Sequence, residues 1–388
     1  MNSEDFQENI SGHLISIPEG GFAYVPNPLP PMNLTWDSEL IEVLSLADRA
    51  LGELAGIGRS LPNPHLLVRP FLRREAVLSS RIEGTQASLA DVLAYEAVQL
   101  PLFDAPDDVR EVHNYVRALE YGLERMSSLP VSLRLIRELH GILLEGVRGE
   151  QFRAGEFRQG QNFIGPPGSS LATATYVPPP PKEMMEALQQ LELYINELSN
   201  LPPLIRLGLI HYQFEAIHPF PDGNGRLGRL LISILLCAWN LLPQPLLYLS
   251  AFFETNRPDY YANLRGVSEK GNWNSWLSFF LNGVSSQAID AAARVKRIND
   301  LRENYRQRFQ QGRSAARLLQ VVDLLFARPL ISVRTVEEEL ALPYPTAERY
   351  IDELVKQGIL ESSGKARNRV FVARDILNAV EETKIVGH

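Results

Sequence analysis

The segment HPFPDGNGRLGR, residues 218–229, brings a histidine, an aspartate, a Gly-Asn-Gly turn and two arginines into one short stretch. His218 carries the side chain whose ordinary pKa lies nearest neutrality, so it is the candidate general base. Asp222 supplies a carboxylate, and Mg²⁺ is commonly held by one or two carboxylates together with phosphate oxygens and water. The order of these residues predicts a site for nucleotide transfer.

The turn and the arginines predict a phosphate site. Prolines on both sides of Phe220 stop the preceding helix, so His218 to Gly225 should form a loop and the next helix should begin at about Arg226. A Gly-Asn-Gly turn that opens a helix exposes backbone N–H groups, and the helix dipole adds partial positive charge. Arg226 and Arg229 share one helix face, which suits a polyphosphate. The predicted phosphate-binding residues are Gly223, Asn224, Gly225, Arg226 and Arg229.

Each of these residues also has an ordinary structural explanation. A histidine before proline is often structural, an aspartate in a turn is often a cap, and an arginine can pair with a nearby acid. Phe220, which alternates with polar residues, is better explained as a buried anchor for the loop. The conjunction of so many groups in one loop favours the functional interpretation.

The composition is that of a globular protein. A chain of 388 residues predicts two or three domains, and 45% hydrophobic with 22% charged residues supports a sizeable core. A net charge of −8 argues against a chain-wide basic surface for nucleic acid. The single cysteine, Cys237, excludes an internal disulfide, and the sequence has neither a signal-peptide pattern nor an apolar stretch of membrane-spanning length. We therefore expect a cytoplasmic protein without membrane association.

The spacing of apolar residues predicts a mainly helical chain. Residues 18–36 are rich in proline and glycine and should be extended, whereas helices are predicted from Asp37 to about Leu100, with breaks at PNPH and EGTQ. Residues 155–181 combine paired glycines, β-branched residues and prolines, which predicts a short β-hairpin. The run RLLISILLCAWNLL after the motif predicts a buried central helix. Further helices are predicted over 108–126, 132–145, 184–198 and 204–216.

Residues 313–388 form a separate predicted unit. Their order of three helices and a hairpin is that of a winged helix-turn-helix. The unit has eleven Lys and Arg against eleven Asp and Glu, and its predicted recognition helix, TAERYIDELVKQ, carries more acids than bases. Only the predicted wing, with Lys365, Arg367 and Arg369, is basic. We expect protein recognition or dimerisation here rather than DNA binding.

The motif resembles, at every fixed position, the signature of Fic proteins, His-x-Phe-x-Asp/Glu-Gly-Asn-Gly-Arg-x-x-Arg, and the resemblance extends over roughly residues 20–290. It implies transfer of AMP from ATP to a Ser, Thr or Tyr hydroxyl of a protein, with release of pyrophosphate. We therefore expect a mainly α fold with a Fic-type helical core and a small β-hairpin flap, followed by the winged helix-turn-helix domain. The expected division is an N-terminal helical region at 1–105, a catalytic core at 106–285, a linker helix at 286–312 and a winged-helix-like domain at 313–388.

The resemblance assigns roles by position. It implies that His218 accepts the proton of the target hydroxyl, that Asp222 holds Mg²⁺ and that Asn224 contacts the α-phosphate. Arg226 and Arg229 would hold the β- and γ-phosphates. The residues at the positions of adenosine contacts are Tyr260, Tyr261 and Asn263, although aromatic residues in a helix are as often part of a core.

A second segment, SSRIEG at residues 79–84, resembles the inhibitory motif Ser/Thr-x-x-x-Glu-Gly/Asn of one Fic class. In that class the glutamate, here Glu83, pairs with the second motif arginine, here Arg229, and prevents a productive position of the γ-phosphate. A glutamate at a helix end is usually solvated surface, but its place before a complete Fic signature favours regulation. The inhibitory residues implied are Ser79, Glu83 and Gly84.

The leading hypothesis is an autoinhibited AMP transferase that modifies a target protein and itself. Removal of AMP stays open because it uses the same glutamate, whereas phosphotransfer is discounted because relatives that perform it change the Gly-Asn-Gly turn. A nucleotide-sensing transcription regulator is the third hypothesis. The expected partners are ATP and a protein target bound by strand addition along the flap near 161–177; a homodimer stays open, and DNA is less favoured.

Overall fold

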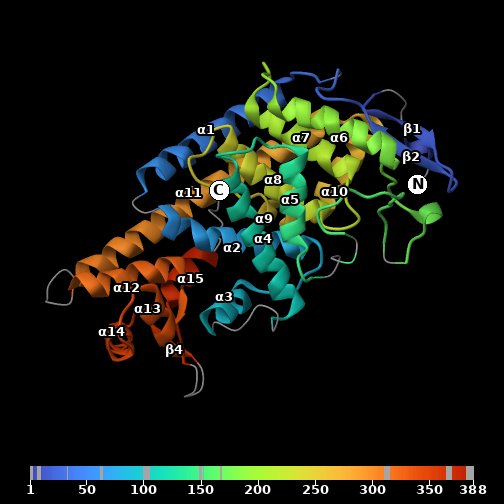
Figure 1. The fold of residues 1–388 in the computed structure, drawn as a ribbon. Coiled ribbons are helices and arrows are strands. Elements are labelled where there is room, and N and C mark those ends of the chain that lie inside the picture. Colours follow the sequence, from blue (N-terminus) through green and yellow to red (C-terminus); the bar gives the residue numbers. More distant parts are fainter. Residues whose placement is uncertain are drawn as a thin grey trace.

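The computed structural model describes residues 3–6, 10–32, 34–61, 64–98, 105–147, 151, 153–166, 168–309, 315–363 and 369–381. Within these ranges the chain is mainly helical, which confirms the predicted fold class (Figure 1). None of the helices in these ranges combines the length and apolar character needed to cross a membrane.

The main helical body is built around α8, the apolar helix that follows the motif. Nearly every residue of α8 from Leu227 to Leu236 is buried, because the helix packs against α2, α4, α5 and α7. Figure 1 places α8 in the middle of this body, and α1 and α11 lie side by side to its left in the view. The helices of the body are α1 (Ser38–Ser60), α2 (Pro64–Ile82), α3 (Leu89–Val98), α4 (Asp107–Arg125), α5 (Leu133–Leu143), α6 (Pro181–Asn196), α7 (Pro203–Ile217), α8 (Asn224–Ala238), α9 (Ser250–Thr255), α10 (Arg257–Lys270) and α11 (Trp273–Arg308).

Helix ends are set by side-chain caps and by residues with left-handed backbone. Asp37 and Ser132 accept hydrogen bonds from the first turns of α1 and α5. The helix after the motif starts at Asn224, so the predicted loop to Gly225 and helix start at Arg226 were wrong by two residues. Gly223 adopts φ 79°, a conformation that glycine reaches without a Cβ penalty, and this lets the chain turn into α8 early.

The strands near the N-terminus were not predicted. Residues 18–36 were expected only to be extended, but β1 (Gly12–Ser16) and β2 (Phe22–Pro26) form an antiparallel hairpin. Its turn contains Gly20 and Gly21, both with φ near 90°. Glycine adopts such positive φ values without a steric penalty, so the two glycines allow the tight turn between the strands.

The hairpin predicted at 161–177, within the segment 155–181, is limited to a single bridge among the residues that the structure describes there. Ile164 pairs with Tyr176 in an isolated antiparallel bridge, and a 3₁₀ turn, η4 (Leu171–Thr173), lies between them. The N–H of Tyr24 in β2 donates to the carbonyl of Val177 at 2.9 Å, so the N-terminal hairpin supports the base of this segment. We call residues 161–177 the flap, although it is mostly irregular.

The C-terminal elements are α12 (Ala315–Ala327), β3 (Leu330–Ser332), α13 (Val333–Glu339), α14 (Tyr344–Lys356), β4 (Glu361–Ser363), β5 (Val370–Val372) and α15 (Arg374–Glu381). The strands form an antiparallel sheet in the order β3-β5-β4. Of the predicted wing, Arg369 is exposed, whereas Lys365 and Arg367 lie outside the described residues. Helices α12 and α15 pack against α2, so this C-terminal unit touches the helix that carries the SSRIEG motif.

Candidate active site

His218 ends α7 in a left-handed conformation, with φ 48° and ψ 62°. This conformation turns the chain away from the helix axis and carries it into the motif loop. Burial lowers the pKa of the imidazole to about 4, and the charge of Arg158 acts in the same direction. The Arg158 side chain also donates to the His218 carbonyl at 2.9 Å, so it fixes the backbone at the candidate base. The ring is therefore neutral near pH 7, as a general base must be.

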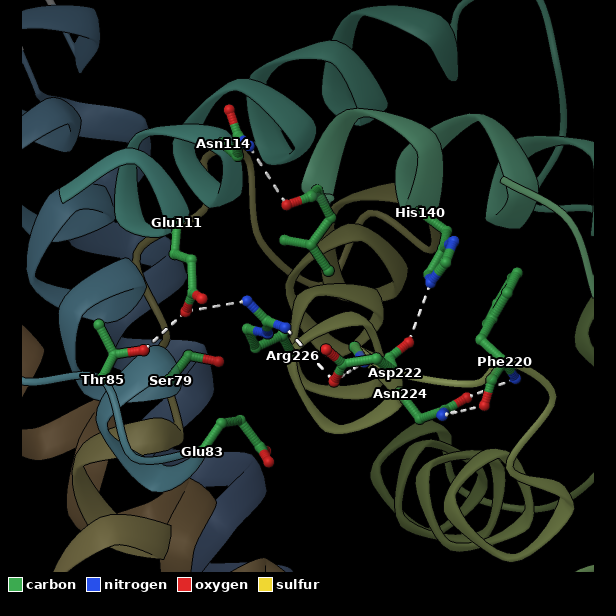
Figure 2. A network of polar contacts seen from close by, with 12 residues as sticks. Ser79, Glu83, Thr85, Glu111, Asn114, His140, Phe220, Asp222, Asn224 and Arg226 are labelled. Carbon is green, nitrogen blue, oxygen red and sulfur yellow. Dashed lines mark hydrogen bonds and ion pairs between the residues drawn. The ribbon is translucent and has the colours of Figure 1, made fainter. Parts of the chain in front are cut away.

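A second histidine, which the sequence analysis did not single out, holds the motif loop. His140 of α5 accepts a hydrogen bond at Nδ1 from the N–H of Gly155 at 2.8 Å, so the neutral ring carries its proton on Nε2. Nε2 lies 3.0 Å from the carbonyl of Asp222, to which it donates (Figure 2). The ring stacks on Phe220 with centroids 3.7 Å apart. Phe220 is fully buried, in agreement with its predicted role as an anchor.

The amide of Asn224 closes the same loop. Its Oδ1 accepts from the N–H of Phe220 at 2.9 Å, and its Nδ2 donates to the Phe220 carbonyl at 2.8 Å (Figure 2). The amide of Asn224 thus pairs with the backbone N–H and carbonyl of Phe220, in the loop between α7 and α8. The contact of Asn224 with an α-phosphate stays a prediction. The glycine on the other side, Gly225, has Glu83 Oε1 only 2.3 Å from where a Cβ would lie. A larger residue there would collide with Glu83.

The two motif arginines are buried and each faces a carboxylate from another helix. Arg226 Nη1 lies 3.2 Å from Oε2 of Glu111 in α4, and Arg226 Nη2 lies 3.6 Å from Asp222 Oδ1. Arg229 Nη2 lies 2.7 Å from Oε1 of Glu83. The two guanidinium groups, which were predicted to bind phosphates, are in this structure paired with protein carboxylates.

Ser79 and Glu83 both contact Arg229. The Ser79 hydroxyl accepts from Arg229 Nε at 3.0 Å, and the Ser79 carbonyl accepts from Nη2 at 2.9 Å. Burial alone would raise the pKa of Glu83, but the charge and hydrogen bond of Arg229 overcome this and hold the pKa below its ordinary value. Gly84 follows with φ 102°, which reverses the chain directly after α2. Glu83 is therefore an ionised carboxylate paired with Arg229, one of the two arginines predicted to bind phosphate.

The residues predicted to contact adenosine lie in different environments. Tyr260 is buried in an aromatic cluster, and its hydroxyl lies 2.8 Å from His211 Nε2, as expected of a core residue. Tyr261 is 43% exposed and lies under the guanidinium of Arg257. Asn263 is half-buried, and its amide oxygen accepts from the hydroxyl of Ser275. Of the three, Tyr261 has a ring available to a ligand.

Asp222 is the acidic residue of the loop that is suited to a metal ion. Its Oδ1 accepts from the N–H of Gly223 at 2.7 Å, and its side chain is 35% exposed. No group of three or more potential metal ligands occurs among the residues that the structure describes. A single carboxylate fits Mg²⁺, which keeps several waters and takes further oxygens from phosphate.

Comparisons with known proteins agree with the motif. Residues 41–124 match the Fic/DOC family N-terminal region, and residues 130–236 match the Fic/DOC family. The chain is 31% and 33% identical over 159 residues to the proteins named protein adenylyltransferase Fic of Drosophila virilis and Drosophila grimshawi. The match covers 40% of this chain in both cases but only 30% and 31% of those relatives, so the chain spans less than a third of their length.

A solved structure shares the fold over most of the chain. The crystal structure of a Fic family protein from Desulfovibrio desulfuricans G20 superimposes with a TM-score of 0.55 at 20% identity. The superposition covers 88% of this chain and 97% of that protein. By these two matches the chain contains a Fic/DOC family N-terminal region and a Fic/DOC family domain, and the shared fold agrees with them.

Proposed function

We propose that this chain is a protein adenylyltransferase whose activity is restrained by Glu83. The observation that carries the proposal is the placement of a neutral, half-buried His218 and two buried arginines around one loop, with Glu83 paired to Arg229. The relatives named protein adenylyltransferase Fic support the reaction type.

The proposed reaction needs one base and a site for three phosphates. His218 accepts the proton of the target Ser, Thr or Tyr hydroxyl as its oxygen bonds to the α-phosphorus of ATP. The bond from that phosphorus to the bridging oxygen breaks, and pyrophosphate leaves. The N–H groups at the start of α8 and the guanidinium groups of Arg226 and Arg229 stabilise the phosphate charge. Arg229 can do so only after Glu83 has left it.

Asp222 is the residue that we propose for Mg²⁺. The bound ion would neutralise phosphate charge in the leaving pyrophosphate. Asp222 Oδ1 faces Arg226 and accepts from the N–H of Gly223, and these contacts direct the carboxylate toward the proposed phosphate site.

The protein target is proposed to bind along the flap. A cavity of about 350 Å³ lies beside the motif loop and is lined by Pro221 and by the stretch from Phe157 to Asn162. The antiparallel bridge between Ile164 and Tyr176 supports this proposal, because it places extended backbone in the flap, as strand addition by an extended segment requires. The C-terminal unit, with the helix and strand order of a winged helix, is proposed to recognise protein rather than DNA.

Removal of AMP from a modified protein is a second candidate, because Glu83 is an ionised carboxylate in the same site as His218. Incubation of an AMP-modified substrate with wild type and Glu83→Gly separates the two directions. Removal requires Glu83, whereas transfer should increase without it.

The test of the proposed function is incorporation of radiolabelled ATP into protein. The Glu83→Gly variant should label itself and lysate proteins, and mass spectrometry should find a mass increase of AMP on Ser, Thr or Tyr. The matched control is Glu83→Gly combined with His218→Ala. That control should lose about 10²–10⁴-fold in rate, as expected for loss of a general base, while ATP binding measured by calorimetry is retained. Near-normal labelling by the control would remove His218 from the mechanism.

A further inference from the structure

Glu111 is a buried carboxylate that lies outside both sequence motifs. It stands in α4 and is 3% exposed, and its Oε2 has two partners at once. The hydroxyl of Thr85 donates to this oxygen at 2.7 Å, and Arg226 Nη1 lies 3.2 Å from it (Figure 2). This oxygen of Glu111 thus connects Thr85, which follows the SSRIEG motif, to Arg226 of the proposed phosphate site.

The charges explain why Glu111 is in this place. Arg226 is 1% exposed, and a guanidinium so deeply buried requires a carboxylate partner. Asp222 faces Arg226 as well but lies farther away, at 3.6 Å, and is partly exposed. Glu111 is therefore the nearer and more deeply buried of the two carboxylates that form ion pairs with Arg226.

Thr85 gives this pair a connection to Glu83. Thr85 is 3% exposed, and its N–H donates to the Ser80 carbonyl at 3.2 Å, so it belongs to the turn that ends α2. Glu83 lies two residues earlier in the same turn. If the turn moves away far enough to free Arg229, Thr85 is withdrawn from Glu111 as well.

We propose that Thr85 is a positioning residue, which through Glu111 ties the turn bearing Glu83 to Arg226. In this arrangement one movement of residues 80–85 changes the surroundings of both motif arginines: Arg229 through Glu83 and Arg226 through Glu111. The proposal rests on the proposed function, because it assigns Thr85 to the restraint of that same site.

The test compares Thr85→Val with Thr85→Ser, since valine keeps the size of threonine but lacks the hydroxyl. Thr85→Val should raise labelling by ATP about tenfold over wild type, the size expected when one hydrogen bond to a charged group is lost. Thr85→Ser should label like wild type. In the Glu83→Gly background, Thr85→Val should not raise labelling further, because the Glu83 carboxylate that the turn positions is already absent. Equal labelling by wild type and Thr85→Val, or an equal increase in both backgrounds, would overturn the proposal.

A measurement without catalysis keeps this inference separate from the proposed function. Hydrogen exchange of the amides at 80–85 should become faster in Thr85→Val, and also in Glu111→Gln, which leaves Thr85 a neutral acceptor. Unchanged exchange in both variants would overturn the link even if the enzyme labels proteins as proposed. Faster exchange in variants that do not label protein would support the connection between Thr85 and Glu111. That result would contradict only the proposed function.

Discussion

At the scale of single residues, the environment of His218 sets the pH range of the proposed reaction. Burial and Arg158 lower the pKa of the ring to about 4, so the base stays neutral as the pH falls through 6. The rate of the Glu83→Gly enzyme should therefore stay nearly level from pH 7 to about pH 5 and decline only below that. A rate that halves near pH 6.5, the ordinary pKa of histidine, would contradict the buried-base assignment. ATP affinity measured at each pH separates titration of the nucleotide from titration of the base.

Asp222 should set the Mg²⁺ requirement. Asp222→Asn keeps the size of the side chain but removes its charge, so half-saturation of activity should need about tenfold more Mg²⁺. The control is Asp352→Asn, a change on the exposed face of α14. If the Mg²⁺ titrations of Asp222→Asn and of the parent superimpose, the metal ion is held by other groups.

Residue identities in the motif could be predicted, but their neighbours could not. The types and spacing in residues 218–229 are enough to propose a base, a metal ligand and phosphate-binding groups. His140 contacts a residue 82 positions away, and Thr85 and Glu111 meet across 26 positions. Such contacts depend on how helices pack, and no local pattern marks them.

At the scale of elements, the end of α2 is the feature that we propose to restrain the site. Its last turn places Ser79 and Glu83 on Arg229 through three hydrogen bonds. Replacing Glu83 with glycine removes the anion that we propose to compete with the γ-phosphate, while Arg229 keeps its charge at any working pH. We expect at least a tenfold increase in self-labelling and target labelling, on the order of one lost charged hydrogen bond.

Three variants complete this prediction. Glu83→Ala should behave like Glu83→Gly, which separates loss of the carboxylate from added backbone freedom. Arg229→Ala should stay inactive even in the Glu83→Gly background, because it lacks the phosphate-binding group. Equal labelling by wild type and Glu83→Gly would show that Glu83 does not restrain the enzyme, and would leave the role of His218 untouched.

Element boundaries were predicted well where apolar spacing is regular and poorly where proline and glycine are dense. The helices from α1 to α7 lie close to their predicted ranges because each buries one apolar face. The flap was predicted as a hairpin from its β-branched residues, but its prolines limit it to the Ile164–Tyr176 bridge. The hairpin β1–β2 was not predicted, because the glycines and prolines of residues 18–36 indicate an extended segment and do not by themselves identify Gly20 and Gly21 as a turn.

At the scale of the whole molecule, α2 lies between the helical body and the C-terminal unit. One side packs against α4, α8 and α9, and another against α12 and α15. Arg73 of α2 pairs with Glu96 of α3 at 2.8 Å and donates to the carbonyl of Ala327 at the end of α12. The inhibitory helix is thus fixed from both sides, an arrangement that the sequence could not reveal because its partners lie at opposite ends of the chain.

Glu75 joins α2 to two helices of the body. Its carboxylate accepts from the hydroxyl of Ser250 in α9 at 2.5 Å and from the hydroxyl of Tyr115 in α4 at 3.3 Å. Burial, only partly offset by these donors and by the charge of Arg229, raises the pKa of Glu75 to about 7. The folded protein therefore keeps a proton on Glu75 at pH values where the unfolded chain has lost it.

The raised pKa of Glu75 predicts that the free energy of unfolding depends on pH. The contribution of Glu75 is fully present below the ordinary glutamate pKa of about 4.3, and it is lost as the pH rises through about 7. Glu75→Gln cannot ionise, so relative to wild type it should gain on the order of 2–3 kcal/mol in free energy of unfolding between pH 5 and pH 8. Urea unfolding of both proteins at the two pH values measures this difference. The exposed change Glu124→Gln in α4 is the control and should show the same difference from wild type at both pH values. If the difference in free energy of unfolding between Glu75→Gln and wild type is the same at pH 5 and pH 8, Glu75 is ionised in the folded protein. The junction of α2, α4 and α9 would then hold a charged carboxylate.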